Sequence, residues 1–286
     1  MTALSDRIAA AFLAACRDEL DAPKPGNVHV FADGHRMTAA EFVRSAEVAA
    51  GPLTASGTRV GLRMLRAVEA TRAAVGTNTN LGIILLCAPL AAAAETARAG
   101  LRTALLDVLE RLDVEDANLA FRAIALAAPG GLGDVARHDV RRPATVTLAQ
   151  AMAEAADRDR IAHQFSSSFA DIFDRGMTWR DTASARQADP KWVTLAVYLG
   201  FLATFPDSHV VRKYGAAVAE EVRRIAAEFE HRLRSEEPAS LLGDLLAWDR
   251  SLKQRAINPG TSADLTVATL FAHRLTDILP TASNSG

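Results

Sequence analysis

Four short turns in this sequence hold most of the side chains that could bind a charged small molecule. They are residues 24–29, 76–82, 206–209 and 258–264, and each sets Asn, Asp, His or Lys beside glycine or proline. All four turns enter segments with a helical pattern, and helix N-termini attract anions through their unpaired N–H groups and their dipole. The chemistry that this pattern favours is the binding of a phosphate-bearing ligand.

The first turn reads Lys-Pro-Gly-Asn-Val-His and presents the polar side chains of Lys24, Asn27 and His29. Two prolines stiffen its backbone, and Gly26 allows a ligand to approach the backbone closely. Lysine can bind phosphate as a point charge. The turn is therefore a candidate phosphate site, with His29 as a candidate catalytic group.

The second turn, at residues 76–82, runs directly into an apolar segment that begins at Leu81. Its backbone amides and the carboxamides of Asn78 and Asn80 therefore lie at a predicted helix N-terminus, beside Gly82. Such an end suits a phosphate group or a ribose.

The third turn, at residues 206–209, sets charged groups at a predicted helix start. Asp207 and His209 lie in the turn, and Arg212 and Lys213 follow about one helical turn later. The helix dipole favours anions at this position. Asp207 is also a typical N-cap residue, so a purely structural role stays open.

The fourth turn, at residues 258–264, precedes a helical segment with an apolar stripe. It supplies Asn258, Gly260, Ser262 and Asp264 as candidate ligand-binding residues. Ser262 is equally typical of a helix cap. A turn of this kind is by itself a common connection between helices. Four such turns, all rich in polar groups, could converge at one end of a helical bundle.

The elements that must position these turns are helices almost throughout. Apolar residues recur three or four apart in most segments, whereas strict alternation is scarce. Proline and glycine breakers divide the chain into roughly ten to twelve helices of ordinary length. We therefore expect a single all-α, multi-helix globular domain over residues 1–280, with a frayed tail at 281–286.

The amino-acid composition indicates which classes of binding partner to expect. The chain has 286 residues and a formal net charge of -2, from 32 basic and 34 acidic residues. This balance indicates neither nucleic acid nor an anionic membrane surface as a partner and favours small molecules. The longest apolar run, residues 81–94, is too short for a membrane span, and the first residues lack a secretory pattern. We expect a cytoplasmic protein, and the sequence leaves open whether it forms a homodimer.

The order of the four turns resembles the motifs of triphosphoribosyl-dephospho-CoA synthases. That family has a KPG turn, an NTHKG-type turn before an apolar helix, a DTN-type turn and a PGGSADL-type turn near the end. Residues 24–27, 78–82, 207–209 and 259–265 correspond to them here. The resemblance extends over nearly the whole chain. No GxxxxGK[ST] motif is present, so nucleotide binding of the P-loop type is excluded.

The resemblance implies an all-helical enzyme that binds ATP with Mg²⁺, joins the nucleotide's ribose C1 to a ribose hydroxyl of dephospho-CoA, and releases adenine. Stabilising the positive C1 and deprotonating the hydroxyl would need charged groups. The residues expected to act in catalysis are Asp207, Asp264 and His29. Those expected to bind the metal are Asp264, Asp207 and Asp134. Those expected to bind nucleotide or phosphate are Lys24, Gly26, Asn27, Asn78, Asn80, Gly82, His209, Arg212, Asn258, Gly260 and Ser262.

The sequence also departs from the family pattern. Asn80 and Leu81 replace the histidine and lysine of the second turn, and Arg36 replaces an expected aspartate. Asp134 keeps a carboxylate in a glycine-rich segment at 130–146, which is a candidate loop over the site. The altered second turn and the Lys-Pro-Gly-Asn-Val-His sequence of the first turn resemble a divergent branch of the family found in archaea and methylotrophic bacteria.

Three interpretations therefore stay open. The first is ribosyl transfer from ATP to dephospho-CoA. The second is a related (phospho)ribosyl transfer with another acceptor, such as a precursor of tetrahydromethanopterin. The third is a non-catalytic helical binding protein, which would gain no thermal stability from ATP.

Overall fold

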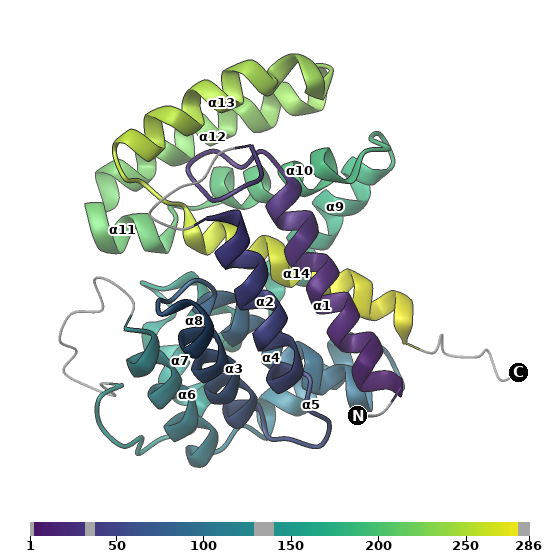
Figure 1. The fold of residues 1–286 in the computed structure, drawn as a ribbon, viewed down its shortest axis with the longest axis vertical. Helices are drawn as coiled ribbons and strands as arrows, with labels where there is room; N and C mark the ends of the chain where they lie inside the picture. The colour runs from purple at the N-terminus through teal and green to yellow at the C-terminus, as the bar shows by residue number, and fades with distance from the viewer. Residues whose placement is uncertain (1–2, 32–37, 129–139, 280–286) are drawn as a thin grey trace, which may run out of the picture.

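The computed structural model describes residues 3–31, 38–128 and 140–279, and these residues form helices joined by turns (Figure 1). The all-α class is confirmed. The described residues form fourteen α-helices and one π-helix, so the expected ten to twelve was too low. Two of the extra breaks, at residues 156–159 and 167–170, contain neither proline nor glycine, so breaker residues did not mark them.

The first eight helices lie within residues 3–166. Their bounds are α1 Ala3–Asp21, α2 Ala39–Leu53, α3 Val60–Val75, α4 Leu81–Thr96, α5 Leu101–Glu110, α6 Val114–Ala127, α7 Leu148–Ala155 and α8 Arg160–Ser166. The remaining elements are the π-helix η1 Asp171–Gly176, α9 Met177–Ser184, α10 Pro190–Thr204, α11 Ser208–Tyr214, α12 Ala216–Ser235, α13 Pro238–Gln254 and α14 Gly260–Ile278.

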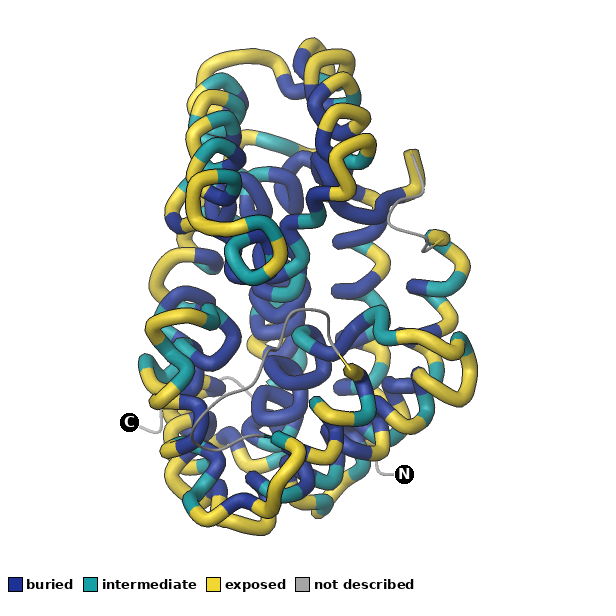
Figure 2. Tube along the Cα trace, turned by 90° about the vertical axis from the view of Figure 1, so that its left-hand side faces the viewer, coloured by how far each residue is buried: buried dark blue, intermediate teal, exposed yellow. Residues whose placement is uncertain are grey.

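Two central helices, α1 and α14, join the two halves of the fold. Figure 1 shows α2 beside α1, α3 to α8 in the lower part of the molecule and α10 to α13 in the upper part. Phe12 of α1 meets Phe271 of α14 edge to face, with ring centroids 5.8 Å apart, a geometry that aromatic pairs prefer. Buried residues run through the middle of the molecule (Figure 2).

The apolar interior consists of two clusters of buried side chains. The larger one joins α1 to α8, η1 and α14. The smaller one joins α10 to α13 and includes Ile257 and Ala263. In it Phe229 of α12 stacks on Trp248 of α13 with centroids 5.1 Å apart. Because α10 and α14 contribute to both clusters, they connect the two parts of the interior.

Helix α4 is apolar on nearly every side, as expected of a helix enclosed by others. It packs against α3, α5 and α14, and most of its side chains are buried. In the described part of the chain no single helix is long and apolar enough to cross a membrane. Among the helices of the described residues, one pair, α4 and α5 with a bend of 112° between them, meets those criteria when taken together.

Candidate active site

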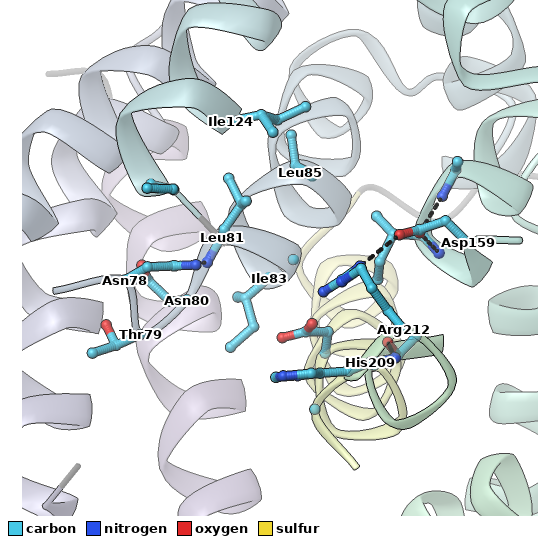
Figure 3. A pocket seen from close by; sticks show the side chains of 18 of the residues that line it. Asn78, Thr79, Asn80, Leu81, Ile83, Leu85, Ile124, Asp159, His209 and Arg212 are labelled. Carbon is cyan, nitrogen blue, oxygen red and sulfur yellow. Dashed lines mark hydrogen bonds and ion pairs between the residues drawn. The ribbon is translucent and has the colours of Figure 1, made fainter. Parts of the chain in front are cut away.

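A cavity of about 1150 Å³ opens between the N-terminus of α4 and helices α6, α7, α8, α11 and α14. Pockets for drug-sized ligands usually measure about 300–1000 Å³, so this cavity has room for more than one small molecule. Figure 3 shows Asn78 to Leu81 on one side, facing His209, Arg212 and Asp159 on the other. Segments more than a hundred residues apart in the sequence therefore form one site.

All four turns of the sequence analysis reach this cavity. Asn27 of the first turn donates a hydrogen bond from Nδ2 to Oδ1 of Asn258 in the fourth, at 2.8 Å. The N–H of His209 in the third turn donates to Oγ1 of Thr261 in the fourth, at 3.2 Å. The predicted site residues on the cavity wall are Asn27, Asn78, Asn80, Gly82, His209, Arg212, Asn258, Gly260 and Asp264.

Lys24 points into the protein and is fully buried. Its Nζ lies 3.1 Å from Oε1 of Glu19 and donates hydrogen bonds to the carbonyl oxygens of Glu19 and Val28, at 2.6 and 2.8 Å. Burial lowers the pKa of Lys24, and the carboxylate of Glu19 opposes that shift. An ammonium group has three donors. All three have protein partners here, so the structure does not offer Lys24 to a phosphate.

His29 and Gly26 hold the first turn against α13. His29 Nε2 lies 3.3 Å from Oδ1 of Asp249, and the Gly26 N–H donates to the same oxygen at 2.8 Å. Burial lowers the pKa of His29. Gly26 has a φ of +79°, and a Cβ there would lie 2.9 Å from Leu252 and from Pro259. The glycine thus serves packing, and neither residue lines the cavity.

Asp207 connects the starts of α11 and α14. Its Oδ1 accepts hydrogen bonds from the N–H groups of His209 and Val210, and its Oδ2 accepts from the N–H and Oγ of Ser262. Burial raises the pKa of Asp207, and these hydrogen bonds oppose the shift. Asp207 and Ser262 are buried behind the wall. The geometry is that of a double helix cap, which uses both carboxylate oxygens.

Two glycines allow close contacts between side chain and backbone. A Cβ on Gly82 would lie 2.0 Å from Oδ2 of Asp264, and one on Gly260 would lie 2.7 Å from Nδ1 of His209. The second residue of α4 must therefore lack a side chain for Asp264 to occupy its position. These glycines leave the space that the side chains of Asp264 and His209 occupy.

Asp264 is the most unusual carboxylate on the wall. Burial raises its pKa well above the ordinary value, and the negative charges of Asp207 and Glu19 add to this effect. The cation of Arg212 opposes it only in part. Within the described residues the Asp264 side chain has no hydrogen-bond or ion-pair partner. A bound cation would compensate this charge.

The side chains of the cavity could supply part of a magnesium site but not all of its ligands. Across residues 3–31, 38–128 and 140–279, no three His, Cys, Asp or Glu side chains gather as a ready metal site. Mg²⁺, however, commonly takes one or two carboxylates together with substrate phosphates and water. Asp264 can supply such a carboxylate. Asp134, the third predicted ligand, lies outside the described residues.

Several wall residues were missing from the predicted set. They are Glu19, Arg72, Arg141, Arg158 and Asp159. Glu19 follows Cys16 by three residues and so falls on the apolar stripe of α1, which is a signal that a sequence can show. Arg72 and Arg158 lie in helical segments without a local pattern that marks a binding residue. Arg141 belongs to the segment 130–146, of which residues 129–139 lie outside the described structure.

The wall combines cations with apolar surface. Arg72, Arg141, Arg158 and Arg212 all contribute to it. Arginine is the side chain best suited to phosphate oxygens. The apolar lining includes Leu85, Phe121, Ile124, Met152 and Ile161, which can contact a planar base. Fold and site together define an all-helical protein with one large cavity whose wall carries both cations and apolar surface.

Residues 5–282 match the CitG family model, described as ATP:dephospho-CoA triphosphoribosyl transferase, and the chain therefore belongs to this family of transferases. A solved structure from Archaeoglobus fulgidus, provisionally assigned as a triphosphoribosyl-dephospho-CoA synthase, shares the fold with a TM-score of 0.64. The two chains are 22% identical, and the match covers 82% of this chain and 99% of that one. No curated protein matches the chain.

Proposed function

We propose that this protein transfers the triphosphoribosyl group of ATP to a ribose hydroxyl of dephospho-CoA and releases adenine. The bond between ribose C1 and adenine breaks, and a bond from C1 to the acceptor oxygen forms. The hydroxyl loses a proton, and the departing adenine gains one. The observation that carries the proposal is a single cavity, formed by all four family-like turns, with room for two ligands.

The triphosphate would bind among the arginines. Arg212 lies beside Asp159, with Nη1 3.3 Å from Oδ2, and this partly buried pair fixes its position. Arg72 and Arg158 are anchored through Nη1 to the carbonyl oxygens of Leu126 and Glu154. An arginine held through one of its donors still has others for phosphate oxygens.

Asp264 would hold the divalent cation that accompanies ATP. A cation there would neutralise the carboxylate and neighbouring phosphate oxygens together. Bound magnesium supplies charge stabilisation for the polyphosphate. Asp207 would act indirectly, because its four hydrogen bonds fix the third and fourth turns and so position His209 and Asp264.

The asparagines would orient sugar hydroxyls. Asn78 Oδ1 accepts a hydrogen bond from the Leu81 N–H at 3.1 Å, which leaves its Nδ2 for a ligand. Asn80 is buried at the cavity wall, and its Nδ2 has no hydrogen-bond partner in the described structure. A buried unpaired donor is unfavourable, so a ligand acceptor would satisfy it.

The test is adenine release, followed by chromatography, from ATP, magnesium and dephospho-CoA. Adenine should form only when dephospho-CoA is present, and Arg212→Ala should weaken ATP binding by about 10-fold or more. Glu95→Gln, on α4 away from the cavity, is the control. Acceptor-dependent adenine release in the wild type is required; no adenine despite tight ATP binding would reject dephospho-CoA as the acceptor.

The second candidate keeps the ribosyl transfer but changes the acceptor. Asn80 and Leu81, which depart from the family pattern, both line the cavity, so the departure alters the surface that meets the substrates. A ribose-bearing precursor of tetrahydromethanopterin is the acceptor to compare. The same assay with each acceptor in turn decides between the two.

A further inference from the structure

We propose that Glu19 is a substrate-binding residue whose Oε2 accepts a hydrogen bond from a ribose hydroxyl in the cavity, with Lys24 as its positioning residue. The inference rests on the proposed function and adds to it a group on α1, outside the four turns. The ribose belongs either to the nucleotide donor or to the acceptor, and the experiment below separates these two sources.

Glu19 combines three features that point to a ligand. It lies on the cavity wall, only 1% of its surface is exposed to solvent, and its Oε2 has no hydrogen-bond partner in the described structure. A buried carboxylate oxygen without a partner is unfavourable, and ordinary protein interiors avoid it. A hydroxyl group from a bound sugar would satisfy this oxygen.

Lys24 fixes which oxygen of Glu19 remains available. Its Nζ lies 3.1 Å from Oε1, while two backbone carbonyl oxygens, those of Glu19 and Val28, hold the ammonium in place. The carboxylate therefore cannot rotate freely, and Oε2 is the oxygen left without a protein partner in the described structure. The lysine of the first turn acts on the site through Glu19 in this arrangement.

The charge balance favours a neutral hydroxyl over a metal ion at Glu19. Lys24 forms an ion pair with Glu19, whereas Asp264 forms no ion pair within the described residues, and the cation of Arg212 offsets the shift of its pKa only in part. Hydrogen bonds to ionised groups are stronger than those between neutral groups. The two carboxylates therefore differ in the ligand group that they favour: Asp264 favours a cation, and Glu19 favours a hydroxyl group.

Asn27 and Asn258 add carboxamide groups to the cavity that Glu19 lines. The two carboxamides are joined by a hydrogen bond of 2.8 Å from Asn27 Nδ2 to Asn258 Oδ1. Carboxylates and carboxamides are hydrogen-bonding partners of sugar hydroxyls.

The experiment measures binding by calorimetry for wild type and Glu19→Gln. One arm uses ATP, 2′-deoxy-ATP and 3′-deoxy-ATP, and the other uses dephospho-CoA and its two deoxyribose forms. Glu19→Gln should weaken binding of one parent ligand by about 10- to 100-fold. The deoxy ligand that lacks the partner hydroxyl should bind wild type and variant alike. The arm in which this occurs identifies the source of the ribose.

Two controls separate this effect from loss of folding. Glu95 pairs with buried Arg63 at 2.8 Å and does not line the cavity, so Glu95→Gln is the matched control. The double variant Glu19→Leu/Lys24→Met removes both charges of the pair, and it should fold yet bind the parent ligand as weakly as Glu19→Gln.

The outcomes are distinct. Equal losses for the parent and both deoxy ligands, or no loss at all, would overturn the role of Glu19 while leaving the proposed function intact. Wild-type protein that binds neither ATP nor dephospho-CoA would reject the proposed function and this inference together.

Discussion

The charged residues of α12 and those around the first turn form two networks with opposite physical character. On α12 the pairs Arg224–Glu228 and Arg232–Glu236 lie at the surface, where water and salt screen them. Around the first turn the pair Lys24–Glu19 is enclosed by protein. The comparison shows that the surface ion pairs leave their side chains free to move. The buried ion pair holds its side chains in fixed positions, because an enclosed charge that loses its partner is strongly unfavourable.

The largest expected effect is on the buried network. Lys24→Met leaves the Glu19 carboxylate buried without a cation, and we expect the free energy of unfolding to fall by about 3–5 kcal/mol. Chemical denaturation measures this change. Adding Glu19→Gln to Lys24→Met should restore most of the loss, and failure of the second substitution to do so would contradict this account of the pair.

Asp264→Asn tests the uncompensated carboxylate in the cavity. We expect adenine release to fall about 100-fold or more, because the variant loses the charge that would hold the cation. The ligand-free variant should melt at the same or a higher temperature than wild type, since a buried negative charge is removed. A lower melting temperature would indicate that Asp264 has a structural partner instead.

Gly82→Ala tests the packing of α4 against that carboxylate. The new Cβ would lie 2.0 Å from Oδ2 of Asp264, so one of the two must move. We expect a loss of about 1–3 kcal/mol in stability, together with weaker binding of Mn²⁺ in the presence of ATP. Gly51→Ala on α2, where a Cβ meets nothing within 4 Å, is the matched control.

Asp171 represents a case between the two networks. Arg160, which is partly exposed, and Gln164 donate hydrogen bonds to the carboxylate of Asp171. These hydrogen bonds hold the pKa of Asp171 below its ordinary value, although burial acts in the opposite direction. A lowered folded-state pKa stabilises the protein above the unfolded value of about 3.9 and loses that contribution as the pH falls through the folded-state pKa. Denaturation at pH 6 and pH 3 should show a smaller acid-induced loss for Asp171→Asn than for wild type.

The smallest effect is expected on α12. Arg232→Ala removes exposed contacts to Glu236 and Asp244 that solvent screens. We expect no resolvable change in melting temperature at either low or high salt concentration, because salt screens these contacts further. A clear loss of stability in Arg232→Ala would contradict the conclusion that the surface ion pairs of α12 contribute less than the buried pair.

Sequence and structure agree where local patterns are sufficient. The apolar series of α1 and the apolar start of α4 predicted helices, and both are confirmed. The segments 76–82 and 258–264 do lead into helices, as predicted, but α4 already begins at Leu81 and α14 at Gly260, so residues 260–264 are part of the helix. The roles of individual side chains were harder to predict, because a turn residue can face a ligand or its own protein with the same sequence.

The sequence by itself determined the helical class and the order of the four turns, because helix periodicity and breaker residues act over a few neighbouring positions. Only the tertiary structure decided the direction of each side chain. His29 turns to Asp249, which is 220 positions away, and Lys24 turns to Glu19 on α1. Asp207 turns to Ser262 and away from the cavity. Such choices depend on which distant groups remain unpaired when the helices pack, and no local pattern contains that information.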